Sequence, residues 1–143
     1  MILVDANVLL HAYQPRSEQH ERCRSWVETA FSGREPVCIA WVTLLAFVRI
    51  ATHPRIFEAP LLPAEAVAIV ASWLERETVS VLEAGEPCWE ILRSLLVEAQ
   101  VTGPLVMDGF LAALALENGA TLATTDRDFA RFPQLKLVDP TAG

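Results

Sequence analysis

Short apolar runs alternate with helical stretches along the whole chain, and this alternation limits the possible folds more than any other feature. The strand-like runs are residues 1–5 (MILVD), 36–40 (PVCIA), 78–82 (TVSVL), 120–125 (ATLATT) and 135–139 (LKLVD). Apolar residues recur at helical spacing in residues 17–31, 42–52, 63–77, 86–100 and 104–119. Strands that alternate with helices form parallel sheets covered by helices. The pattern predicts an α/β fold with a central, mostly parallel sheet.

Several helix ends are marked by specific residues. Ser17 can cap the first helix, and Pro63 suits the first turn of another. His53 precedes Pro54 and is therefore disfavoured in helical geometry, which ends the helix before it. Gly119 is placed to close the last long helix. No repeat or linker interrupts the order, so we expect a single domain over residues 1–143.

Charge, cysteine content and hydropathy exclude several classes of protein. The net charge of −7 argues against general attraction to nucleic acid, although a local basic patch remains compatible with it. Three cysteines without CxxC spacing argue against a disulfide framework or a zinc ribbon and favour a reducing cytoplasm. The N-terminal run lacks a basic leader and contains Asp5, so it does not read as a signal peptide. No apolar run approaches the ~20 residues of a membrane span.

Four of the five aspartates lie where strands end or helices begin. Asp5 ends the first apolar run, Asp108 begins a helix, and Asp126 and Asp128 follow the run ATLATT. Taken singly, Asp108, Asp126 and Asp128 have an ordinary explanation, because carboxylates cap helices and favour their first turns. Asp5 is different, since a lone charge in an apolar run must be paired, hydrogen-bonded or bound to a metal.

Taken together, the four aspartates indicate a metal site. The carboxyl ends of parallel strands line the crevice where α/β proteins bind ligands, and helix N-termini face the same edge. Carboxylates gathered there repel each other unless a cation neutralises them, and all-oxygen ligands suit Mg²⁺ or Mn²⁺. Such sites are suited to cleavage of phosphodiester bonds.

Two segments carry a resemblance to a known family. MILVDANVLLHAY resembles the opening of a PIN domain, whose first strand ends in Asp with Asn two residues later. VMDGFLAALALENGATLATTDRDFARF is similar to the second half of that fold. The joint pattern most resembles the VapC toxins of type II toxin–antitoxin pairs. The resemblance implies a three-layer α/β/α fold and an endoribonuclease that depends on Mg²⁺ or Mn²⁺. It also implies a cognate VapB antitoxin that inhibits the enzyme.

The resemblance assigns roles to individual residues. Asp5, Asp108 and Asp126 match the metal-binding acids of the family, and Asp128 matches a position that helps with a second metal. Asn7 and Thr125 resemble residues that orient Asp5 and steady the site. For these two, a local backbone cap is an equally good explanation.

The chain departs from the family at Ala46, where a Glu is usual. The missing carboxylate leaves open whether one or two metals bind. Arg49 and His53 lie three and seven residues further on, so these positions share one face until the helix ends. Arg49 can either bind RNA phosphate or pair with a site aspartate. With Arg55, these are the RNA-binding candidates.

Three other interpretations compete with a PIN ribonuclease. A haloacid-dehalogenase-like phosphatase needs a second Asp where Asn7 stands, and a response-regulator receiver needs a Lys that this chain does not place correctly. The third alternative is a catalytically degenerate PIN domain that binds RNA or protein, which the Ala46 departure motivates. The apolar surface of segments such as residues 63–75 further predicts a homodimer, with the antitoxin covering more of that surface.

Overall fold

The computed structural model describes residues 1–142 and has a five-stranded sheet at its centre. The strands are β1 (Ile2–Val4), β2 (Val37–Ala40), β3 (Val79–Leu82), β4 (Thr121–Ala123) and β5 (Leu137–Val138). Their order is β3-β2-β1-β4-β5, and every neighbouring pair is parallel. The predicted α/β class is confirmed, with a sheet that is parallel throughout rather than mostly so.

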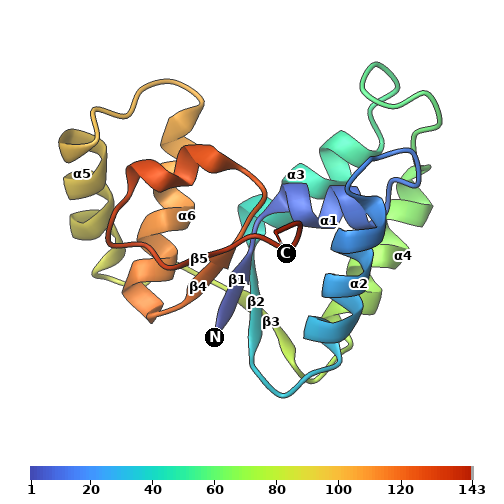
Figure 1. Cartoon of the computed structure of the whole chain (residues 1–143), viewed down its shortest axis with the longest axis horizontal. Coiled ribbons are helices and arrows are strands. Elements are labelled where there is room, and N and C mark those ends of the chain that lie inside the picture. Colours follow the sequence, from blue (N-terminus) through green and yellow to red (C-terminus); the bar gives the residue numbers. More distant parts are fainter. Residues whose placement is uncertain (143) are drawn as a thin grey trace.

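Helices cover both faces of the sheet and give the molecule three layers (Figure 1). The helices are α1 (Ala6–Ala12), α2 (His20–Phe31), α3 (Trp41–Ala51), α4 (Pro63–Leu74), α5 (Cys88–Glu98) and α6 (Leu105–Asn118), with a 3₁₀ helix, η1 (Arg127–Arg131). Helices α1 to α4 lie on one side, and α5 and α6 lie on the other (Figure 1). Along the chain, β2 and β3 are added on one side of β1, and β4 and β5 are added on its other side. Connections between parallel strands are right-handed, so connections that run in opposite directions along the sheet place their helices on opposite faces. No helix within residues 1–142 is long and apolar enough to cross a membrane.

The sheet divides the interior into two apolar cores. Leu3 and Val4 are both fully buried, and they belong to different cores because successive side chains of a strand point to opposite faces. Leu3 packs in the core that contains much of α6, whereas Val4 packs in the core formed by the helices of the first half of the chain. Runs such as β1, buried on both faces, therefore need apolar residues at every position.

The predicted helix ends at Pro63, Gly119 and the His53-Pro54 step are confirmed. Pro63 is the first residue of α4, and α3 ends at Ala51, before His53. Gly119 follows α6 with φ +62°, a left-handed conformation that glycine adopts without a Cβ clash.

Other expectations about helices were wrong. Helix α1 was not expected, because the run after Asp5 is too apolar and short to distinguish a helix from a strand; Asp5 caps it by accepting a hydrogen bond from Ala6 N. Helix α2 begins at His20 and not at Ser17, whose hydroxyl instead accepts from Gln19 N in a local turn. Helix α4 ends at Leu74, three residues earlier than expected.

Candidate metal centre

The candidate site lies where the direction of the strand order reverses, at the carboxyl ends of β1 and β4. Val4 pairs with Ala123 across these strands, so the next residues, Asp5 and Thr124, lie side by side. The backbone N–H of Asp5 donates to Ala123 O at 2.9 Å, which continues the pairing by one residue. Open parallel sheets bind ligands at such switch points, because the two connections leave in opposite directions and open a crevice.

Thr124 is the hydrogen-bonding centre of this junction. Its hydroxyl donates to Asp5 Oδ2 at 2.9 Å and accepts from Asp126 N at 3.0 Å and from Asn7 Nδ2 at 3.3 Å. A hydroxyl has one proton to donate and two lone pairs, so all its capacity is used. The side chain is 4% exposed, and the network therefore holds Asp5 in one orientation.

The structure assigns the supporting residues differently from the sequence. Thr125 was expected to steady the site with its side chain, but that role falls to Thr124, and Thr125 contributes its backbone N–H to Asn7 Oδ1 at 3.2 Å. Asn7 reaches Asp5 through Thr124 and makes no direct hydrogen bond to it. The doublet Thr124-Thr125 offers two hydroxyls, and only the register of β4 against β1 decides which one faces Asp5.

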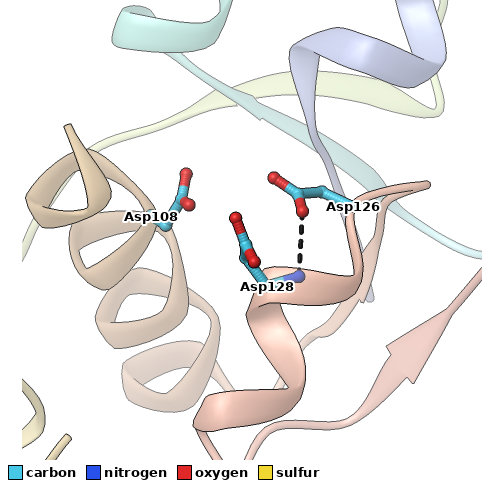
Figure 2. Close-up of side chains that lie close together, drawn as sticks. All are labelled: Asp108, Asp126 and Asp128. Atoms are coloured by element: carbon cyan, nitrogen blue, oxygen red, sulfur yellow. Dashed lines mark hydrogen bonds between the residues drawn. The ribbon is translucent and has the colours of Figure 1, made fainter.

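Three further carboxylates converge beside this junction. One oxygen from each of Asp108, Asp126 and Asp128 lies within 4.8 Å of the others. Figure 2 shows Asp108 approaching from α6, whereas Asp126 and Asp128 come from the turn that begins η1. Asp126 caps η1 by accepting from Asp128 N at 2.9 Å (Figure 2), as its position after a strand predicted.

The electrostatics of the cluster are those of crowded acids. Burial and the neighbouring Asp126, Asp5 and Asp128 raise the pKa of Asp108 to about 6, and Arg131 offsets part of this rise. Burial also raises the pKa of Asp5, against the lowering effect of its hydrogen bonds from Thr124 and Ala6. Among residues 1–142, the ion pair at this cluster joins Arg131 Nη2 to Asp128 Oδ1 at 3.7 Å. One arginine cannot balance four carboxylates, so much of the negative charge is left without a protein cation.

The donor set fits a hard divalent cation. All candidate ligands are carboxylate oxygens, which Mg²⁺ and Mn²⁺ prefer over the nitrogen and sulfur ligands typical of zinc. The three carboxylates that lie closest together are those of Asp108, Asp126 and Asp128. The sequence had instead predicted Asp5, Asp108 and Asp126 as the metal ligands. Asp5 is outside this closest group, although its charge contributes to the raised pKa of Asp108, and its two oxygens accept hydrogen bonds from Ala6 N and Thr124 Oγ1.

A groove of about 650 Å³ joins the acidic cluster to α3. Its lining includes Asp5, Ala46, Arg49 and Asp108, together with apolar side chains of α3 and α6. Ala46 and Arg49 therefore share the face that looks toward the site, as their spacing predicted. Arg49 forms no ion pair within residues 1–142, so the alternative of a salt bridge to a site aspartate does not describe this conformation.

His53 and Arg55 lie beyond this face. Helix α3 ends at Ala51, so the helical spacing that relates Ala46 to Arg49 does not extend to His53. His53 Nδ1 instead accepts from Arg55 N at 3.0 Å and stabilises the turn that follows the helix. The shared face was expected only until the helix ends, and because the helix ends before His53, Ala46 and Arg49 line the groove and His53 does not.

The fold and cluster together define a parallel α/β protein with an acidic site at its switch point, and sequence comparison identifies the family. The family model for the PIN domain matches residues 2–135 of this chain. The chain is 39% identical over 142 residues to Ribonuclease VapC37 of Mycobacterium tuberculosis (strain ATCC 25618 / H37Rv), with 99% of each chain covered. It is 37% identical over 140 residues to Ribonuclease VapC33 of the same strain, with 98% of each covered. The chain belongs to the PIN domain family, and these full-length relatives are named VapC ribonucleases.

Solved structures agree on the fold. VapBC2 from Rickettsia felis, bound to a DNA fragment from its promoter, matches with a TM-score of 0.72 at 17% identity over 97% of this chain and 98% of that one. VapBC-1 from nontypeable Haemophilus influenzae matches with a TM-score of 0.71 at 19% identity, over 99% of this chain and 100% of that one. The implied PIN-like, three-layer architecture is confirmed.

Proposed function

We propose that this chain is the toxin of a VapBC-type pair: an endoribonuclease that cleaves RNA phosphodiester bonds and is neutralised by a cognate VapB-type antitoxin. The observation that carries the proposal is the convergence of Asp108, Asp126 and Asp128 beside Asp5, in a chain whose full-length relatives are named ribonucleases. We further propose a single PIN domain over residues 1–143, supported by one continuous sheet, and a cytoplasmic location, supported by three free cysteines.

We assign Mg²⁺ or Mn²⁺ to the acidic cluster, with Asp108, Asp126 and Asp128 as the nearest ligands and Asp5 beside them. The ion would activate the attacking water and neutralise charge that develops at the cleaved phosphate. Thr124 and Asn7 keep Asp5 oriented, which fixes one side of the site before substrate arrives.

Arg49 is the cation that we assign to the RNA backbone. It lines the groove next to Asp5 and Asp108 without a carboxylate partner of its own, and its planar guanidinium suits a phosphate group. The net charge of −7 makes such a local cation necessary, because the field of the whole chain repels RNA. Arg55, exposed in the following turn, is a second candidate contact, and His53 beside it is a third.

Loss of one carboxylate tests this proposal. Purified protein should cleave RNA in Mg²⁺ or Mn²⁺, and EDTA should stop the reaction. The change Asp126→Asn or Asp5→Asn should lower the rate by orders of magnitude, whereas Asp139→Asn, which alters the one aspartate outside the site, should leave it intact.

The alternative function is a degenerate PIN domain that only binds RNA or protein, and Ala46 is the observation that favours it. The alternative predicts RNA binding without cleavage in any divalent metal. Cleavage that is equal in wild-type protein and in the Asp5→Asn and Asp126→Asn variants would indicate a contaminating nuclease and would leave binding as the better reading.

A further inference from the structure

A second cavity, separate from the groove between α3 and α6, runs along α1. Its volume is about 630 Å³, and it is lined by Asn7, Leu10, His11, Gln14, Arg16, Ser17, Ile56, Phe57 and Glu58. One wall is α1 with the turn that follows it, and the other is the connection between α3 and α4. An ion pair between Arg16 and Glu58 joins these two walls. A smaller cavity of about 300 Å³ continues from it and shares Leu10, Gln14, Arg16 and Phe57.

This cavity begins beside the metal centre. Asn7 lines it and also donates to Thr124, the residue that holds Asp5. A substrate whose cleaved bond lies at the aspartates can therefore place an adjacent group in the cavity without crossing another element.

The polar groups of the cavity are neutral or already paired. The side-chain amide of Gln14 makes no hydrogen bond within residues 1–142. His11 Nδ1 is 2.6 Å from Ser17 Oγ, and burial lowers the pKa of His11, so its ring is neutral at pH 7. The charge of Arg16 is matched by Glu58.

The remaining walls are apolar. Leu10 lies on α1, and Ile56 and Phe57 face it from the connection after α3. Ile56 is 52% exposed, so part of this apolar wall is open to solvent. An aromatic ring and aliphatic side chains together with a neutral amide suit a nucleobase, which stacks on aromatic side chains and forms hydrogen bonds at its edge. Arg16, the one Arg or Lys among the described lining residues, is paired with Glu58, so a phosphate suits this cavity less well than a neutral base does.

We propose that this cavity, here termed the base pocket, binds one unpaired nucleobase of the RNA next to the cleaved bond. Gln14 hydrogen-bonds the edge of the base, and Phe57 packs against its ring. The inference rests on the proposed endoribonuclease function and adds to it a preference for a particular base at one position relative to the cut.

Cleavage-site mapping tests the base pocket. A pool of single-stranded RNA with random sequence is cleaved by the wild-type protein and by Gln14→Ala, Phe57→Ala and Gln134→Ala, and the product ends are sequenced. The wild-type protein should favour one base at a fixed position, and Gln14→Ala should reduce that preference about tenfold, the value of a good amide–base contact. Gln134 lies in the turn before β5 and lines neither part of the pocket, so Gln134→Ala should keep the preference.

A second measurement removes the base instead of the side chain. An RNA that lacks the base at the preferred position should be cleaved by the wild-type protein more slowly than intact RNA is cleaved by Gln14→Ala, because the missing base removes the contacts with both Gln14 and Phe57. On this RNA, Gln14→Ala should cleave as fast as the wild-type protein, because the contact that the substitution removes is already absent. The side chain of Gln14 makes no hydrogen bond within residues 1–142, so this variant loses none and should fold normally even if Phe57→Ala does not.

The outcomes separate this inference from the proposed function. Cleavage with an unchanged base preference in Gln14→Ala and Phe57→Ala overturns the base pocket and leaves the endoribonuclease in place. If these variants instead lose only antitoxin binding, the cavity belongs to the protein partner and the inference is also wrong. Failure of the wild-type protein to cleave RNA in any divalent metal overturns both.

Discussion

Among single residues, Thr124 determines the geometry of the site most directly. Its hydroxyl joins Asp5, Asn7 and the backbone of Asp126, which come from the β1–α1 junction and the end of β4. Loss of a buried hydroxyl leaves several partners unsatisfied, which costs more than the net value of one hydrogen bond. Its neighbour Thr125 makes no side-chain hydrogen bond within residues 1–142 and provides a natural control.

We predict that Thr124→Val lowers the free energy of unfolding by about 1–3 kcal/mol, because buried polar partners lose their bonds. RNA cleavage should fall about 10–100-fold, the usual cost of losing a residue that orients a metal ligand. Thr125→Val should stay close to wild type in both thermal melting and cleavage. Equal losses in the two variants would show that the register of β4 does not control the site.

Asp108 carries the largest electrostatic strain in the cluster. Burial and three neighbouring carboxylates raise its pKa from 3.8 to about 6 in the folded protein. At pH values between 3.8 and about 6, Asp108 keeps its proton in the folded protein and has lost it in the unfolded chain. The stability of the metal-free protein should therefore fall as the pH rises from about 4 to 6 and then level off.

We predict that Asp108→Asn removes most of this pH dependence. At pH 7 in EDTA the variant should be more stable than wild type by about 1 kcal/mol, a value reduced for solvent screening of a partly exposed side chain. Thermal melting between pH 4 and 8 measures the effect, and Asp139→Asn serves as control. Parallel pH profiles for wild type and Asp108→Asn would contradict the assigned origin of the strain.

Among the helices, α3 and α6 form the two walls of the groove beside the aspartates. Gly109 follows Asp108 in α6, and a Cβ at this position would lie 2.9 Å from Leu96 Cδ2 of α5. A glycine here allows the two helices to approach closely next to the site. On the opposite wall, Ala46 of α3 carries no charge, so Arg49 has no acid on its own helix face.

We predict that Ala46→Glu tightens Mn²⁺ binding, measured by calorimetric titration without RNA, because one more anion faces the cluster. The control is Ala46→Gln, which has nearly the same shape without the charge and should bind Mn²⁺ as the wild-type protein does. Cleavage should rise less than affinity, since the new carboxylate competes for Arg49. Equal affinities for the Glu and Gln variants would show that position 46 does not face the metal.

For the whole molecule, metal binding and folding are coupled, because the aspartates come together only in the folded chain. We predict that Mg²⁺ or Mn²⁺ raises the melting temperature, with a stabilisation of about 2.7 kcal/mol at a hundredfold excess over the dissociation constant. Asp108→Asn should weaken this response, and Asp139→Asn should retain it. A melting temperature that stays the same in millimolar Mg²⁺ and in millimolar Mn²⁺ would count against a metal centre.

The surface of α4 is the second whole-molecule feature. Leu62 just before it, and Val67 and Leu74 within it, are 65%, 58% and 37% exposed, which leaves apolar surface beyond what the core uses. We predict a homodimer that buries this surface, and light scattering should give about twice the 15.8 kDa chain mass. Val67→Lys should shift the protein toward the monomer, whereas Glu77→Lys, exposed just after the same helix and without apolar area, should not. A wild-type monomer at high concentration would contradict the prediction.

The sequence by itself determined the elements and the chemistry that they carry. Apolar periodicity predicted all five strands and five of the six α-helices, and Gly119 and Pro63 marked helix ends correctly, because these signals act within a few residues. The placement of Asp5, Asp108 and Asp126 at element ends was also readable, since each follows a strand or begins a helix. Helix α1 was missed because seven residues are too few to show a period.

Only the tertiary structure decided how these parts meet. The strand order places β1 next to β4, and their register sets Asp5 beside Thr124, 119 residues away, in place of Thr125. It also brought Asp128 into the closest group and left Asp5 outside it. Such pairings depend on packing summed over two cores and six helices, and a shift of one residue in a strand turns every side chain to the other face. Local patterns specify the elements, whereas the site exists only where the complete sheet aligns their ends.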